Sequence, residues 1–129
     1  MQNYNLDEIF VKHWIKFDYD VSSRVGVTPP HDCFRVEDSI HYKSLVSQDF
    51  TDYQQLITTT DQKEHSLELF VDLVDKVTPN FLQTHKIKLQ RWSLGDYKYT
   101  VVDGCHRLAI ILYKNLHNNN CIPQEWVEV

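Results

Sequence analysis

Cysteine is scarce in this sequence, and its spacing argues against a whole class of proteins. The 129 residues include three cysteines, Cys33, Cys105 and Cys121, and no two of them form a Cys-x-x-Cys pair. An odd and sparse set is not typical of the disulfide framework of a secreted domain. We therefore expect a protein of a reducing compartment, with the cytoplasm as its location.

Positively charged residues are also fewer than negatively charged ones. Lysine and arginine number 13 against 18 acidic residues, which gives a net charge of −5 with histidine neutral. This balance argues against bulk attraction to nucleic acid or to an anionic membrane surface. It leaves room for a local basic pocket that takes a small phosphorylated ligand.

Long apolar runs are missing as well. The longest, Leu108 to Tyr113, is far shorter than a membrane span requires. The first ten residues, "MQNYNLDEIF", are polar and acidic where a signal peptide would be basic and then apolar. We expect a soluble chain with neither a membrane nor a nucleic acid as its partner.

The length and the apolar content fit one globular domain spanning residues 1–129. Hydrophobic residues make up 42% of the chain, which is ordinary for a folded protein, and we find no repeat and no linker. A chain of this length buries a core without disulfides or metals. We expect a divergent, helical N-terminal part over residues 1–60 and a core over residues 62–116.

The apolar patterning predicts an α+β fold. Helical spacing of apolar residues indicates four helical segments, residues 6–17, 38–57 in two pieces, 62–77 and 105–116. Alternation around "SLGD" predicts a hairpin over residues 86–102, and the tail "CIPQEWVEV" is expected to add a last strand. Two starts compete for the helix at 62–77, a capping box of Asp61 with Glu64 or a cap at Ser66.

The stretch "VVDGCHRLAIILY", residues 101–113, carries the most chemical information. A strand that turns through Gly104 into a helix leaves backbone N–H groups at the helix start, which favour an anion. Arg107 in the first turn offers a planar set of donors suited to phosphate, and His106 adds another. Asp103 has three possible roles: to orient Arg107, to hold Mg²⁺, or to cap the helix.

This stretch resembles the signature of the ParB/sulfiredoxin superfamily, a strand followed by Asp/Gly-Gly-x-His-Arg and a helix. The matching residues are Asp103, Gly104, His106 and Arg107, with Cys105 at the variable position. The resemblance covers residues 62–116 and implies a small mixed sheet packed against helices. It also implies that nucleotide phosphates bind at this turn, whereas the reaction varies widely within the superfamily.

Among the branches of that superfamily, the sequence is most similar to stand-alone ParB-like proteins with an Asp-Gly-x-His-Arg turn. This likeness implies a kinase that uses ATP or ADP with Mg²⁺ and phosphorylates a sugar, a glycan or a small metabolite, as in polysaccharide biosynthesis. Phosphates would be held by Gly104, Cys105, His106 and Arg107. Asp103 and His106 would assist catalysis, and Asp103 would also hold the metal.

A second cluster, "DQKEHS", supplies the remaining candidates. Glu64 or His65, with Asp61 as a further option, would accept the proton of the acceptor hydroxyl. Ser66 and Lys88 are additional candidates for phosphate binding. The plainer alternative is that the acidic residues only favour a helix start and that Lys88 is solvated.

Two other functions stay open. Gly104 to Arg107 also match the Gly-Cys-His-Arg part of the sulfiredoxin motif, which implies an ATP-dependent redox enzyme with Cys105 as its nucleophile. A non-catalytic nucleotide-binding module is the other alternative. The DNA-clamp branch is disfavoured because its Glu-Arg-Arg motif and its helical DNA-binding domain are not found here.

Several other residues are expected to serve the fold. His31, Cys33 and His41 have a spacing that fits no standard metal site. The aromatic residues of 38–57 follow helical spacing and are expected in the core, namely Tyr42, Phe50 and Tyr53. Trp92 lies at the predicted hairpin and is expected to be a packed edge residue. The oligomeric state is left open.

Overall fold

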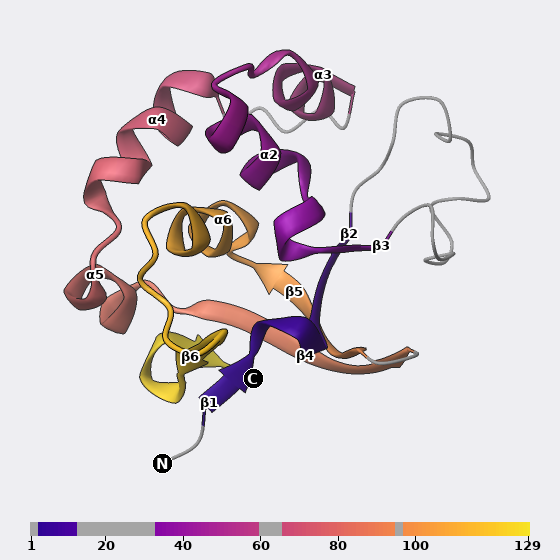
Figure 1. Ribbon diagram of the computed structural model, residues 1–129, viewed down its shortest axis with the longest axis vertical. Helices are drawn as coiled ribbons and strands as arrows, with labels where there is room; N and C mark the ends of the chain where they lie inside the picture. The colour runs from indigo at the N-terminus through magenta and orange to yellow at the C-terminus, as the bar shows by residue number, and fades with distance from the viewer. Residues whose placement is uncertain (1–2, 13–32, 60–65, 95–96) are drawn as a thin grey trace.

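The protein combines a five-stranded sheet with a layer of helices, as the α+β prediction requires. The computed structural model describes residues 3–12, 33–59, 66–94 and 97–129. The large sheet has the strand order β3-β2-β5-β4-β7, and a separate two-stranded sheet pairs β1 with β6. Figure 1 shows the helices gathered on one side of the large sheet, with α6 closest to its centre.

The strands come from both ends of the chain. The N-terminal strands are β1 (Asn3–Asn5), β2 (Ile9–Lys12) and β3 (Cys33–Arg35). The later strands are β4 (Ile87–Leu94), β5 (Tyr97–Asp103), β6 (Cys121–Pro123) and β7 (Val127–Glu128). Pairing is antiparallel for β2 with β3 and for β4 with β5, and parallel for β2 with β5 and for β4 with β7. The sheet is therefore mixed, and the predictions of a hairpin over 86–102 and of a strand in the tail are confirmed.

The prediction of a helix over residues 6–17 is wrong for its described part. Leu6–Glu8 form one turn of 3₁₀ helix, η1, and Ile9–Lys12 form β2; residues 13–17 lie outside the described residues. Ile9, Phe10 and Val11 are all buried. A strand that is covered on both faces presents a continuous apolar run, which periodicity does not separate from a helix.

The helices carry clear start signals. They are α2 (Ile40–Ser47), α3 (Thr51–Thr59), α4 (Leu67–Lys76), α5 (Pro79–Thr84) and α6 (Cys105–Tyr113), with short 3₁₀ turns η3 (Val36–Asp38) and η4 (Gln124–Trp126). The two helical pieces predicted over 38–57 are confirmed as α2 and α3. Pro79 is the first residue of α5, a position at which proline is tolerated in a helix.

Two predicted helices are shorter than expected. The helix predicted from residue 62 has Ser66 as its N-cap and begins at Leu67, so the competing Ser66 start is the correct one. The helix predicted over 105–116 ends at Tyr113. Asp61 and Glu64, the predicted capping box, lie outside the described residues.

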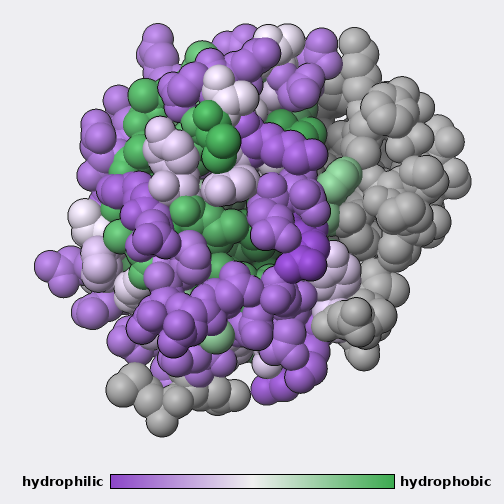
Figure 2. All heavy atoms as spheres, in the orientation of Figure 1, coloured by the Kyte–Doolittle hydropathy of each residue, from purple (hydrophilic) through white to green (hydrophobic). Residues whose placement is uncertain are grey.

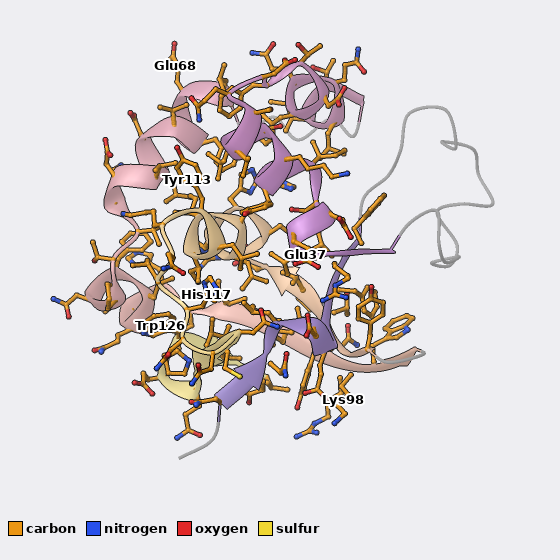
Figure 3. The ribbon with its side chains drawn as sticks, in the orientation of Figure 1. Glu37, Glu68, Lys98, Tyr113, His117 and Trp126 are labelled. Atoms are coloured by element: carbon orange, nitrogen blue, oxygen red, sulfur yellow. The ribbon has the colours of Figure 1, made fainter. Side chains whose placement is uncertain are left out.

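The core lies between α6 and the sheet. Four consecutive residues of α6, Leu108 to Ile111, are buried, as expected for a helix that is apolar nearly all round. Trp126 of η4 is also buried and lies beside α5 (Figure 3). Apolar residues reach the surface in the middle of the face shown in Figure 2, with polar residues around them. No helix within the described ranges is both long and apolar enough to cross a membrane.

Candidate functional site

The turn between β5 and α6 depends on a glycine. Gly104 has φ +119° and ψ 21°, a conformation that other residues rarely adopt. A Cβ at this position would lie 3.2 Å from Cδ1 and 3.3 Å from Cα of Ile87. The backbone of the motif is therefore packed directly on the first residue of β4. Glycine is required at position 104 for two reasons, the positive φ of the backbone and the close contact with Ile87.

The start of α6 differs from the other well-defined helix starts. The side chains of Ser39, Ser66 and Thr78 accept backbone N–H bonds at the starts of α2, α4 and α5. Gly104 precedes α6 and has no side chain to do so, and the first helical bond runs from Leu108 N to Gly104 O. The first-turn amides of such a helix point toward the turn and, with the helix dipole, favour an anion.

Arg107 clamps this turn onto the start of β4. Its Nη1 donates to the carbonyl oxygens of His85 and Lys86, both at 2.8 Å. Its Nη2 lies 3.1 Å from Oδ2 of Asp103, and the side chain is 15% exposed. Both Nη1 hydrogens are thus committed to backbone carbonyls, so a ligand would meet the Nε and Nη2 edge of the guanidinium.

Asp103 takes one of its three expected roles in this structure. Its carboxylate is paired with Arg107, so it orients the guanidinium. The expectation that it caps α6 is wrong, since Gly104 occupies the N-cap position and no bond from Asp103 to the helix amides is found among the described residues. The Asp103 side chain is 62% exposed, and its expected role in Mg²⁺ binding stays a prediction.

A β-bulge places Asp103 beside Lys88. Lys88 pairs with Asp103, whereas Leu89 pairs with Val101, so Val102 is an extra residue in β5. Bulges are frequent next to functional sites because they redirect a side chain. Here the bulge puts Asp103 level with Lys88 on the two neighbouring strands.

Lys88 also faces a second carboxylate. It pairs with Glu128 of β7, and its Nζ lies 3.9 Å from Glu128 Oε2. Asp103, Lys88 and Glu128 therefore form a row of alternating charge across β5, β4 and β7. The three side chains are all exposed. Lys88 stands next to the motif, and its expected contact with phosphate stays a prediction.

His106 lies on the other side of the first turn of α6. Its Nε2 is 2.8 Å from the hydroxyl oxygen of Tyr53 on α3. The ring of His41 on α2 is centred 4.4 Å away, and that of Phe70 on α4 is 5.0 Å away. His106 thus joins a buried aromatic cluster at which α2, α3 and α4 meet α6. Sequence reasoning grouped His106 with Arg107 and missed this partner.

Tyr53 is the polar centre of that cluster. It is fully buried, which confirms the expectation that it belongs to the core. Burial raises the pKa of Tyr53 to about 12, because the apolar surroundings disfavour the phenolate. The hydroxyl is therefore protonated at neutral pH. Only its position on a helical face was available from the sequence, which gave no sign of the bond to His106.

Ser66 is described, whereas the candidate proton acceptors near it are not. Asp61, Glu64 and His65 lie outside the described residues. The Ser66 hydroxyl accepts from Leu69 N at 3.1 Å, so it caps α4, and its expected phosphate contact stays a prediction. One turn later, Phe70 touches the ring of His106. The start of α4 is thereby held near the motif turn.

Neither the remaining candidate residues nor the comparisons with known proteins identify a function or a family. Cys105 is the half-buried first residue of α6, and His31 lies outside the described residues. No group of three His, Cys, Asp or Glu residues in the described ranges is placed to hold a metal ion. Searches against protein-family models, curated proteins and solved structures find no match in any of the three.

Proposed function

We propose that this chain is a nucleotide-dependent phosphotransferase whose phosphate site is the turn from Asp103 to Arg107. It would transfer a phosphate of ATP, or of ADP, to a hydroxyl of a sugar, a glycan or a small metabolite, with Mg²⁺. The observation that carries the proposal is the start of α6 at Gly104, with a partly buried and oriented guanidinium in its first turn. Phosphoryl transfer depends mostly on such positioning and charge neutralisation.

Three features support phosphate as the ligand. The α6 start has a glycine where α2, α4 and α5 have a capping hydroxyl. Arg107 presents a planar edge that matches two phosphate oxygens better than a lysine would. The resemblance of the motif to the ParB/sulfiredoxin signature points to the same turn. The transfer step rests on that resemblance, with Glu64 or His65 as the proposed proton acceptor.

Binding is tested first. The melting temperature is measured with Mg²⁺ and each of ATP, ADP, CTP and GTP, relative to the nucleotide-free protein. A ligand at 100 times its Kd stabilises the fold by about 2.7 kcal/mol, which shifts the melting temperature by several degrees. We expect a shift with at least one nucleotide. No shift with any of them contradicts the proposal.

The matched variants are Arg107→Lys and Arg91→Lys. Both keep the charge and lose the planar fork, but Arg91 is exposed on β4 and has no ion pair or hydrogen bond in the described part of the chain. Each variant is compared with its own nucleotide-free form, because Arg107 also supports the fold. We expect the nucleotide-induced shift to fall only in Arg107→Lys.

Turnover is tested by ³¹P NMR with sugar and glycan acceptors. We expect Glu64→Gln or His65→Ala to abolish turnover and to leave nucleotide binding intact. Cys105→Ser is expected to leave both unchanged, and loss of activity in that variant would favour the redox alternative. Nucleotide binding without turnover on any acceptor would favour the non-catalytic module.

A further inference from the structure

The contact between Tyr53 and His106 is the observation from which the position of the imidazole proton is argued. Tyr53 comes from α3 and is 0% exposed, and its hydroxyl oxygen is 2.8 Å from His106 Nε2. A buried hydroxyl needs an acceptor for its proton. Within the described ranges, Nε2 of His106 is the hydrogen-bonding partner of the Tyr53 hydroxyl.

The direction of this bond follows from counting protons. If Nε2 carried a hydrogen, it would donate to Tyr53, and the hydroxyl proton of Tyr53 would then need a second buried acceptor. If Nε2 is unprotonated, one bond satisfies both groups, with the hydroxyl as donor and the ring nitrogen as acceptor. Burial holds the pKa of Tyr53 at about 12, so its hydroxyl keeps the proton that it donates. A neutral His106 then has its proton on Nδ1.

The neighbouring rings also favour a neutral imidazole. The ring of His41 on α2 is centred 4.4 Å from that of His106, at an interplanar angle of 77°. Two imidazolium ions at this separation would repel each other, since His41 is buried and His106 is half-buried. Two further neighbours, Phe70 on α4 and Tyr53 on α3, are an apolar ring and a neutral phenol, so neither of these two side chains supplies a negative charge.

We propose that Tyr53 is a positioning residue that holds His106 as the neutral Nδ1–H tautomer at the opening turn of α6. His106 then serves the phosphate site as an uncharged, single-donor ligand, while Arg107 supplies the positive charge. This inference rests on the proposed function for its ligand. The tautomer itself is a property of the ligand-free protein and is measured without any nucleotide.

The tautomer is read from two-bond ¹H–¹⁵N correlations of the histidine rings at neutral pH. In the wild type we expect the pattern of an unprotonated Nε2 and a protonated Nδ1 for His106. Tyr53→Phe keeps the ring and removes the hydroxyl, and we expect it to shift His106 toward the Nε2–H tautomer. Tyr42→Phe, a half-buried change on α2, is the matched control and should leave the pattern unchanged.

Three spectroscopic results would overturn the assignment: a protonated Nε2 in the wild type, an imidazolium pattern, or an unchanged tautomer in Tyr53→Phe. A loss of folding would move every histidine signal together, whereas the proposal requires a selective change at His106. The outcome therefore separates positioning from simple support of the core.

Measuring nucleotide affinity tests whether Tyr53 affects the function of the site. With MgATP as the probe, we expect Tyr53→Phe to weaken binding about two- to tenfold, the loss that one hydrogen bond accounts for, and Tyr42→Phe to leave it unchanged. Equal affinity in wild type and Tyr53→Phe refutes the positioning role and leaves the proposed function intact. If the wild type binds no nucleotide at all, the proposed function fails and the ligand role of His106 fails with it, while the tautomer result stands.

Discussion

The two sides of the first turn of α6 are built from different interactions. His106 faces the helices, where its neighbours are the rings of His41, Tyr53 and Phe70. Arg107, the next residue, faces the end of the sheet, where it contacts backbone carbonyls and the carboxylate of Asp103. Successive residues of a helix point about 100° apart, so one short motif can serve both environments.

This difference predicts two kinds of response to mutation. The His106 side depends on the packing of aromatic rings and on the part-buried hydrogen bond to Tyr53, so its variants should act through packing and be insensitive to salt. The Asp103–Arg107 side combines the bonds from Arg107 to two backbone carbonyls with the exposed carboxylate of Asp103, so part of its contribution should be screened by salt. The variants below separate the two sides, from the largest expected effect to the smallest.

Phe70→Ala tests the packed side most severely. Phe70 is 2% exposed and contacts the rings of both Tyr53 and His106. Truncation of a buried phenylalanine costs about 3–5 kcal/mol, through lost burial and the cavity that remains. Urea denaturation measures this change, with Leu69→Ala, a 55% exposed position on the same helix, as the control. A cost below about 1 kcal/mol would contradict the assignment of this cluster to the core.

Gly104→Ala tests the turn that joins the two sides. The added Cβ lies 3.2–3.3 Å from atoms of Ile87, and the alanine residue has to adopt φ +119°. Backbone strain and overpacking each cost about 1–3 kcal/mol, so we expect a loss of about 2–4 kcal/mol by urea denaturation.

Combining Gly104→Ala with Ile87→Val sharpens the test. The valine removes Cδ1, the nearest of the contacting atoms. We expect the double variant to lose less stability than the sum of the losses in the two single variants. The loss that remains is attributed to the strained backbone at position 104. Full recovery would show that the dihedral angle is not a constraint.

Arg107→Met tests the hydrogen bonds that Arg107 makes on the other side of the turn. The variant keeps the apolar stem and removes the bonds to His85 O and Lys86 O. We expect a loss of about 1–3 kcal/mol, because two carbonyls lose their donors, and little dependence on salt. Arg91→Met on β4 is the exposed control, with an expected change within about 0.5 kcal/mol. Equal effects in the two variants would argue against the clamp.

Asp103→Asn tests the exposed partner of the clamp. Its ion pair with Arg107 is largely solvated on the Asp103 side, so we expect a cost of about 0–1 kcal/mol that shrinks at high salt. For nucleotide binding the variant is more informative. If Asp103 holds Mg²⁺, the Mg²⁺ dependence of binding falls in Asp103→Asn, whereas an unchanged dependence assigns Asp103 to Arg107 alone.

Local signals in the sequence account for much of the fold. Serine before α2 and α4, alternation in the hairpin and the Asp-Gly turn were sufficient to predict those elements. The N-terminal strand β2 was missed because its side chains are buried on both faces and so show no alternation. Its place between β3 and β5 is set by contacts with residues far along the chain.

Only part of the candidate site could be predicted from the sequence. Gly104 and the pairing of Asp103 with Arg107 follow from spacing within one turn, since residues four apart on or beside a helix face each other. The carbonyl partners of Arg107 are backbone atoms, which any residue types supply. The Tyr53 partner of His106 is 53 positions away, and no local pattern links the two residues.

The central claim is that phosphates bind at the turn that opens α6. It is tested most directly by titrating the ¹⁵N-labelled protein with MgATP and following the backbone amide signals. We predict saturable shifts that are largest at the amides of Cys105, His106 and Arg107, with much smaller shifts along β1 and β6. Shifts that centre elsewhere, or no shifts at all, would contradict the claim.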